Sequence, residues 1–369
     1  MRFIEEFRDP RPVRAAREAL LREAEGLPPA AFMEVCGTHT MSAFRFGVRG
    51  MLPANVRLLS GPGCPVCVTP NDYLDRALAY ARTKGVVVAT FGDMMRVPGS
   101  RSSLEKERAI GADVRVVYSP LDALDLARRE PSKRIVFLGV GFETTAPAVG
   151  ASVLEARASG LRNFTVLCGH KLVPPALEAL LAVKELRLHG FLCPGHVSAI
   201  IGADAYLPVA RDRRVPCVIA GFEPLDMIQG LVLLLKQVRA KAAEVGNQYA
   251  RVVTREGNRK AQEVLARVFE PCDTPWRGLG PIPRSGLRLR EEFRDHDAEA
   301  ALPLGRLEPS AENPACECGR VLQGLRTPLE CPLFGKACRP DSPVGACMVS
   351  SEGTCAAYHK YGMDHFAHE

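Results

Sequence analysis

The sequence predicts an α/β protein with two similar domains built on parallel sheets, followed by a small cysteine-rich iron–sulfur domain. Short apolar runs alternate with helical patterns up to residue 250, and six of the thirteen cysteines lie between residues 316 and 355. Strands that alternate with helices of this length form right-handed βαβ units and buried parallel sheets. A chain of 369 residues, 47% of them apolar, is long enough for two or three domains, each with its own core.

Eight apolar runs are the expected strands, and helical patterns lie between many of them. An amphipathic helix is expected first, over 13–25, and Gly26 and the following prolines end it. The expected strands are 32–35, 56–59, 86–91, 114–118, 135–140, 164–167, 190–192 and 215–219. Further helices are expected at 72–83, 175–186 and 225–243. The polar segment 126–133 divides the strands into two groups of four, which predicts one domain over 1–130 and a second over 131–250.

The chain changes character after residue 250. Residues 254–270 still predict a helix, whereas 271–315 is rich in Pro, Gly, Arg and Glu and contains the sole tryptophan, Trp276. From Cys316 onward there is no long apolar periodicity, so this part is too poor in apolar residues to fold by burial alone. We therefore expect a third domain, over 251–369, that bound metal or another cross-link holds together.

Composition excludes several classes of protein. The 48 basic and 42 acidic residues leave a net charge of +6 without a basic block, which argues against nucleic-acid binding. The longest apolar runs are short, as at 231–235, so no membrane span is expected. Acidic residues stand near the N-terminus where a signal peptide would need an apolar core, which predicts a cytoplasmic protein. The odd number of cysteines then favours metal or thiol chemistry over a disulfide framework.

Cysteines and a histidine follow the first two expected strands. Cys36 and His39 belong to the segment 34–40, and Cys64 and Cys67 belong to 61–67. In open α/β sheets, ligands bind beyond the carboxyl ends of the strands, so these four side chains are expected to meet in one crevice. The C-x-x-C pair alone fits a redox dithiol or half of a zinc site equally well. The third cysteine and the histidine favour a metal or redox centre, with all three thiolates as candidate ligands.

Polar groups also follow the strands of the second expected domain. Glu143 lies in the segment 139–147, His170 follows the next strand, and His196 follows the third. A carboxylate at a strand end commonly handles protons, which favours a role for Glu143. Each histidine could equally be satisfied locally, and the threonines after Glu143 could be helix caps. The glycines of 139–141 resemble part of a dinucleotide loop but lack the third glycine, so nucleotide binding is a weak alternative.

The C-terminal cysteines give the strongest metal signal. Structural zinc prefers C-x-x-C pairs, and the spacing here contains none. Four of the thiols would suit a 4Fe–4S cluster, and the other two could form a redox pair beside it. Spacing does not select the four ligands. The six candidates are Cys316, Cys318, Cys331, Cys338, Cys347 and Cys355.

Four motifs together resemble the HypD family of nickel–iron hydrogenase maturation proteins. They are the segments 36–40, 61–70, 141–147 and 345–355, and the resemblance extends over essentially the whole chain. It implies two α/β domains and a 4Fe–4S domain whose surroundings are similar to those in ferredoxin:thioredoxin reductase, where an active disulfide lies beside the cluster. It also implies a complex with the chaperone HypC and with HypE, which delivers cyanide as a thiocyanate. On that complex the Fe(CN)2CO group of the hydrogenase is assembled.

The resemblance also implies roles for single residues. Cys36 would bind the iron together with a HypC cysteine, with His39 as its polar neighbour. Cys64 and Cys67 would be the dithiol that relays electrons, and Glu143 would face the same cleft. Many members of the family have a second histidine where this chain has Met41, so only His39 is carried over.

We therefore expect a redox-active scaffold for iron-cofactor assembly rather than a simple turnover enzyme. The alternative is an iron–sulfur-dependent dithiol/disulfide oxidoreductase that uses Cys64 and Cys67.

Overall fold

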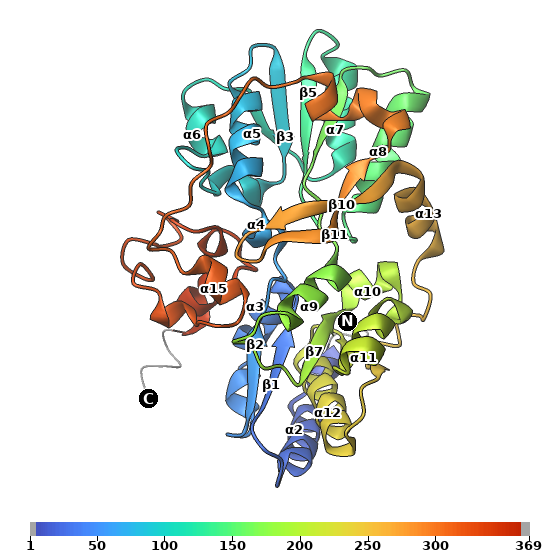
Figure 1. Cartoon of the computed structure of the whole chain (residues 1–369), viewed down its shortest axis with the longest axis vertical. Coiled ribbons are helices and arrows are strands. Elements are labelled where there is room, and N and C mark those ends of the chain that lie inside the picture. The colour runs from blue at the N-terminus through green and yellow to red at the C-terminus, as the bar shows by residue number, and fades with distance from the viewer. Residues whose placement is uncertain (1–4, 363–369) are drawn as a thin grey trace.

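Two parallel sheets form the centre of the protein in a computed structural model that describes residues 5–362 (Figure 1). Sheet A has the strand order β2-β1-β7-β8-β9, and sheet B has the order β4-β3-β5-β6. The strands of sheet A are β1 (Ala30–Glu34), β2 (Val56–Ser60), β7 (Gly190–Pro194), β8 (Cys217–Ala220) and β9 (Val245–Asn247). Those of sheet B are β3 (Val86–Thr90), β4 (Val114–Val116), β5 (Arg134–Gly139) and β6 (Phe164–Cys168). The predicted α/β class with two parallel-sheet units is confirmed.

The strands do not divide between the sheets at residue 130, as the expected grouping into two consecutive sets of four requires. The first two strands pair with the last three, and the four middle strands form sheet B. Strand β1 pairs with β7 through Phe32 opposite Gly190, far away in the sequence. Apolar periodicity reports that a strand is buried but not which sheet it joins, because a parallel neighbour needs only a crossover connection. The polar segment at 126–133 is the end of α7 and the turn before β5, so it lies inside one sheet unit and is not a boundary between two.

Helices cover the sheets and connect them. The first described helices are α1 (Glu5–Arg8), α2 (Pro10–Ala24), α3 (Gly37–Arg45), α4 (Pro65–Val68), α5 (Asn71–Ala81), α6 (Leu104–Ala109), α7 (Pro120–Arg129) and α8 (Ala146–Ala158). They are followed by α9 (Val173–Leu181), α10 (Gly195–Ile201), α11 (Leu207–Arg213), α12 (Pro224–Ala240), α13 (Arg259–Val268), α14 (Ala298–Ala301), α15 (Cys318–Leu322) and α16 (Thr354–Ala357). The chain passes from sheet A to sheet B through α5 and returns through α9. Among these helices, none within residues 5–362 is both long and apolar enough to cross a bilayer.

An antiparallel hairpin lies between the two sheets (Figure 1). Its strands, β10 (Phe269–Trp276) and β11 (Gly280–Leu289), were not expected from the proline-rich sequence. A two-stranded ribbon tolerates prolines because each strand has one edge free of ladder hydrogen bonds. Trp276 is buried, donates from Nε1 to Ser285 Oγ at 2.8 Å and stacks on Phe142 of the segment after β5. The hairpin thereby anchors to sheet B.

The cysteine-rich segment packs beside the hairpin and against both sheet units. It contains α15, the 3-10 turn η6 (Ala346–Met348) and α16. Its apolar residues Val321, Leu322 and Met348 are all buried, and Leu322 and Met348 belong to the same core cluster as Met33 of sheet A and Val88 of sheet B. This packing sets the cysteines next to the loops that follow the first two strands.

Candidate redox and metal site

The loops after β1 and β2 lie against each other. The strands pair in register, with Glu34 opposite Ser60, so both chains leave the sheet at the same edge. Gly37 N donates to Gly63 O at 2.9 Å, and a Cβ at Gly63 would overlap the backbone of Cys36. The glycine in the second loop is required because two backbones meet there without room for a side chain. The structure thus brings Cys36 close to the loop that carries Cys64 and Cys67.

Cys36 is the N-cap residue of α3 and is buried. Its Sγ lies 3.9 Å from both ring nitrogens of His196, which α10 supplies from the end of β7. Burial raises the pKa of the Cys36 thiol, and the carboxylates of Glu352 and Glu34 raise it further. The backbone N–H groups of Thr38 and His39 oppose this shift because they donate to the sulfur. The thiolate therefore requires a positive partner, such as a metal ion, to form at neutral pH.

Glu34 holds the Cys36 loop in place through hydrogen bonds. Its buried carboxyl accepts from Cys36 N at 3.1 Å and from Thr40 Oγ1. Burial raises the pKa of this carboxyl to about 7, and the hydrogen bonds and the nearby Arg49 oppose the rise. Glu34 is not among the site residues predicted from the sequence, although a carboxylate at the last position of a strand, two residues before a cysteine, is a usable signal.

Two histidines lie on either side of Phe222. The ring of His39 is 4.9 Å from the Phe222 ring and that of His196 is 5.0 Å from it. His39 Nε2 is 2.9 Å from Gly221 O, whereas the buried Nδ1 has no partner among the described residues. Burial lowers the pKa of each histidine to about 4, so both imidazoles are neutral at pH 7. The sequence placed His196 in a second crevice, but the pairing of β1 with β7 brings it to Cys36.

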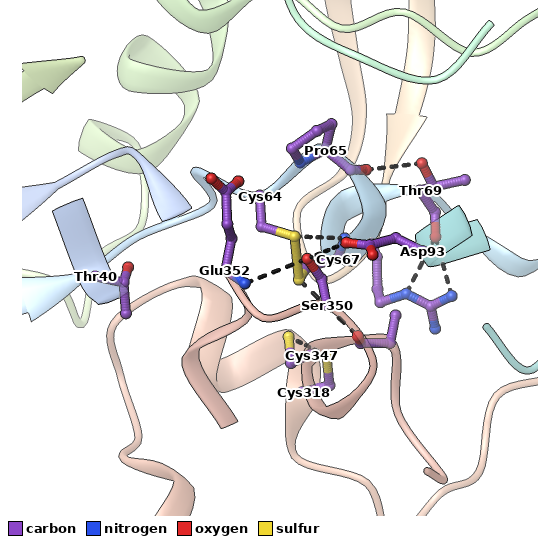
Figure 2. The surroundings of a disulfide bond; sticks show 12 residues. Thr40, Cys64, Pro65, Cys67, Thr69, Asp93, Cys318, Cys347, Ser350 and Glu352 are labelled. Atoms are coloured by element: carbon purple, nitrogen blue, oxygen red, sulfur yellow. Dashed lines mark hydrogen bonds between the residues drawn. A yellow bond between two sulfur atoms is a disulfide. The ribbon is translucent and has the colours of Figure 1, made fainter. Parts of the chain in front are cut away.

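Cys64 and Cys67 form a disulfide across the start of α4 (Figure 2). Both are buried, and Cys67 N donates to Cys64 Sγ at 3.2 Å. The C-terminal segment reaches this disulfide: Cys67 Sγ lies 4.0 Å from Ala346 O, the residue before Cys347. The disulfide is therefore shielded from solvent and in contact with the cysteine-rich segment.

Four of the six C-terminal cysteines, Cys316, Cys318, Cys347 and Cys355, form a connected set of thiols. Cys318 and Cys347 approach to 2.7 Å between their sulfur atoms. Hydrogen bonds with Cys316 and Cys347 lower the pKa of Cys318, and the guanidinium of Arg277 adds to this effect. Side-chain hydrogen bonds with Cys318 and Cys355 raise the pKa of Cys347. Sulfur donors of this kind suit iron, although within residues 5–362 no group of three or more donors has the arrangement of a metal site.

Ser350 and Glu352 join the cysteine-rich segment to both sheet units (Figure 2). Ser350 Oγ donates to Asp93 Oδ2 at 2.8 Å, in the turn after β3. Glu352 Oε1 accepts from Thr38 Oγ1 at 2.6 Å, in the first turn of α3. A Cβ at Gly37 would overlap Glu352, so the two segments are in direct backbone contact. Glu352 lies within the motif 345–355, but only the cysteines of that motif are among the site residues predicted from the sequence.

Glu143 and His170 lie at the carboxyl edge of sheet B. Glu143 Oε1 accepts from Val173 N at 2.9 Å, and its buried Oε2 has no partner among the described residues. Burial raises the pKa of Glu143 to about 7 and lowers that of His170 to about 3. The His170 ring packs edge-on against Phe269 of the hairpin. Glu143 is thus hydrogen-bonded to the start of α9, and the His170 ring contacts β10. Neither of these contacts involves Cys36, whose thiol contacts His196.

A family model matches residues 12–362 of the chain. It is the HypD model, described as the hydrogenase formation hypA family. The chain belongs to the HypD family. Among its relatives, the hydrogenase maturation factor HypD of Azotobacter vinelandii is 48% identical over 98% of this chain and 97% of its own length. HypD of Escherichia coli K12 is 46% identical over 98% of both chains. The hydrogenase expression/formation protein HupD of Azotobacter chroococcum mcd 1 is 48% identical over 98% of this chain and 97% of its own length.

Membership in the HypD family places the chain among hydrogenase maturation factors. The four motifs that carried the resemblance lie within the matched residues, and three of them meet in the structure: the Cys36 loop, the Cys64–Cys67 loop and the segment that ends at Cys355.

Proposed function

We propose that this HypD-family protein is the scaffold and redox component on which the Fe(CN)2CO group of a nickel–iron hydrogenase is assembled. The observation that supports the proposal is the contact between three cysteine-bearing segments. The Cys36 loop contacts the loop of the Cys64–Cys67 disulfide through Gly63, and the segment that carries Cys347 contacts both. In this proposal the Cys36 thiol binds a metal close to a Cys64–Cys67 pair that supplies electrons when it is reduced.

In this proposal the iron is cargo, and Cys36 holds it through a thiolate. A cysteine of a HypC-type chaperone completes the sulfur ligation, which leaves the other positions of the iron open for diatomic ligands. The imidazoles of His39 and His196 belong to the same site and, because they are neutral, add no positive charge to it. A HypE-type partner brings cyanide bound as a thiocyanate.

The disulfide and its reduced dithiol account for the electrons that cyanide transfer consumes. Cleavage of R–S–CN takes up two electrons, gives the carrier thiol and releases cyanide to the iron. Oxidation of the Cys64 and Cys67 thiols supplies these electrons: the two S–H bonds break, the S–S bond forms, one proton goes to the carrier sulfur and one to solvent. Glu143, at the carboxyl edge of sheet B, is half-protonated near pH 7 and can therefore donate or accept a proton there.

We infer that four of the six C-terminal cysteines hold a 4Fe–4S cluster. The connected thiols of Cys316, Cys318, Cys347 and Cys355 and the buried cation of Arg277 support this donor set. When bound, the cluster supplies single electrons to its neighbours. The protein's part is to hold it against the Cys64–Cys67 disulfide, which Ala346 contacts.

The test is an infrared spectrum of the anaerobic protein, purified after co-expression with HypC- and HypE-type partners. Bands of iron-bound cyanide and carbonyl are expected, and Cys36→Ala should abolish them while the iron and sulfide of the C-terminal cluster persist. A blank spectrum from protein with a full cluster and an intact partner complex would contradict the scaffold function.

The second candidate function is a dithiol/disulfide oxidoreductase, favoured by the disulfide that lies under the cysteine-rich segment. It predicts the opposite response to substitution. Cys36→Ala should then leave thiol turnover intact, and Cys64→Ala should end it.

A further inference from the structure

A cavity of about 400 Å³ with several charged side chains in its lining lies beside the cysteine-rich segment. Three parts of the chain line it: residues 98–106, which follow the turn after β3, Arg277 in the hairpin turn, and residues 311–316 with 344–345 of the C-terminal segment. Its lining includes the cations Arg101, Lys106 and Arg277 and the carboxylate of Glu312. The lining of this cavity does not include Cys36, Cys64 or Cys67.

The cavity is at one end of a series of sulfur atoms, and the Cys64–Cys67 disulfide is at the other. Cys316 lines the cavity and hydrogen-bonds Cys318. Cys318 Sγ is 2.7 Å from Cys347 Sγ, and Ala346, beside Cys347, contacts Cys67. Cys318 and Cys347 are buried, whereas Cys316 is half-buried. A carrier that binds on the Cys316 side would therefore deliver electrons to the thiols proposed to hold the cluster, without passing the Cys36 loop.

The cations of the cavity differ in whether their donor groups are available to a ligand. Arg277 is buried, and its guanidinium donates to Thr69 O and Asn71 Oδ1 and pairs with Glu312. Because its donors are in use, Arg277 cannot clamp a small anion inside the cavity. The other cations are at the rim and exposed.

The rim leaves positive charge available to a large partner. Lys106 has no ion pair within the described part of the chain, and Arg101 pairs with the exposed Glu308 at 2.5 Å. Arg306 adds a third exposed cation in an adjoining cavity that shares Ser100 and Arg101. An exposed ion pair contributes little free energy, so a carboxylate of a partner can replace Glu308 at Arg101. Exposed cations around a recess suit the acidic surface of a protein better than a small molecule.

We propose that this rim is the docking surface for an acidic protein that carries single electrons. This inference rests on the proposed function, because the carrier's electrons serve to reduce the Cys64–Cys67 disulfide. In this step, two carriers are each oxidised by one electron. The two electrons break the S–S bond, and two protons from solvent complete the two thiols. The carrier docks at Arg101, Lys106 and Arg306, on the Cys316 side, and leaves the Cys36 side open for the assembly partners.

The experiment measures how fast a photoreduced ferredoxin-type protein reduces the disulfide in the full chain, under anaerobic conditions and at low ionic strength. The variant is Arg101→Glu combined with Lys106→Glu. The matched control is Arg14→Glu combined with Arg17→Glu, two exposed residues of α2 that give the same change in net charge. Thiols are counted by alkylation, and dithiothreitol serves as a small neutral reductant.

The rim variant is expected to be reduced by the carrier roughly ten-fold more slowly or worse, with a flatter dependence on salt, because steering by charge is lost. The α2 variant should match the unmodified protein, and dithiothreitol should reduce all three at one rate. Equal carrier rates in the two variants would overturn the docking surface, and so would a rim variant that dithiothreitol also reduces slowly. Failure of the scaffold function itself is recognised separately, by the absence of iron-bound cyanide and carbonyl bands.

Discussion

Two buried carboxyl groups, Glu34 and Glu143, have pKa values raised to about 7. In an unfolded chain, a glutamate loses its proton near pH 4.3. Between these values the folded protein binds more protons than the unfolded chain, so the free energy of unfolding falls as the pH rises. Burying a carboxylate is tolerated at Glu34 because four groups oppose its desolvation, whereas Glu143 has an oxygen atom without a partner among the described residues.

The first prediction concerns Glu143→Gln. The amide can still accept from Val173 N but does not ionise, so the variant should lose part of the decline in stability between pH 4.5 and pH 8. At pH 8 we expect it to be about 3 kcal/mol more stable than the unmodified protein, and at pH 4.5 nearly equal to it. Urea unfolding at the two pH values checks this. Glu105→Gln, at an exposed position of α6, is the control and should change neither value. If the free energy of unfolding of the Glu143→Gln variant depended on pH as steeply as that of the unmodified protein, the raised pKa of Glu143 would be contradicted.

A second residue-scale prediction concerns the meeting of the two loops. Gly63→Ala places a Cβ where the Cys36 backbone lies, so the loops must separate, and we expect a loss of about 3 kcal/mol in the free energy of unfolding. Gly50→Ala is the matched control, because a Cβ there meets nothing within 4 Å. Chemical unfolding of both variants under reducing conditions gives the comparison. Equal midpoints would mean that the contact with Cys36 is not tight.

Among the elements, the β10–β11 hairpin does most to position the C-terminal segment. Arg277, just after β10, donates to Thr69 O after α4 and to Asn71 Oδ1 at the start of α5, and it pairs with Glu312. A Cβ at Gly278 would overlap Gly319 of α15, so the hairpin turn is also in backbone contact with the cysteine-rich segment. A proline-rich stretch without apolar periodicity thus links α4, the helix that contains Cys67, to the C-terminal cysteines.

The element-scale prediction is that Arg277→Met loosens this link. The substitution leaves the buried Thr69 carbonyl and the Asn71 amide oxygen without a donor, which costs about 3 kcal/mol. Hydrogen exchange should speed up in residues 310–347, and thermal unfolding should begin earlier. Arg288→Met, which breaks an exposed pair with Glu270 on the same hairpin, should cost less than about 1 kcal/mol by comparison. Unchanged exchange in the C-terminal segment of the Arg277→Met variant would show that other contacts hold it.

At the scale of the whole molecule, the C-terminal segment joins the two sheet units at the site. Ser350 contacts the turn after β3 of sheet B, and Glu352 contacts the first turn of α3, which follows β1 of sheet A. Any movement of one unit relative to the other must therefore stretch residues 350–352, which lie between Cys347 and Cys355. The redox chemistry of the cysteines and the position of Cys36 are mechanically connected through these residues.

The last prediction concerns Glu352→Ala. Loss of the charge-assisted bond to Thr38 should lower hydrogen-exchange protection in residues 346–357 and in α3 about ten-fold, which corresponds to about 1.4 kcal/mol. Protection in β3 and β5 should stay unchanged because their pairing is not involved. Glu330→Ala removes a carboxylate that caps its own turn at Thr327 and pairs with the nearby Arg326, so its effect should stay local. Equal protection of α3 in both variants would exclude the proposed connection.

The sequence by itself determined the α/β class, the family, and the meeting of the Cys36 and Cys64–Cys67 loops. These depend on local patterns: strands that alternate with helices, and cysteines directly after two strands that pair as neighbours in both sequence and space. The helix at 13–25 is found at Pro10–Ala24, where Asp9 caps its start and Gly26, with a positive φ, follows its end.

Only the tertiary structure decided which strands share a sheet, that His196 reaches Cys36, and that Glu352 contacts α3. Each of these depends on a pairing between distant parts of the chain, such as β1 with β7 or the C-terminal segment with the first loop. A hydrophobic pattern fixes which face of an element is buried and not what buries it. Partner choice is set by the packing of the whole chain.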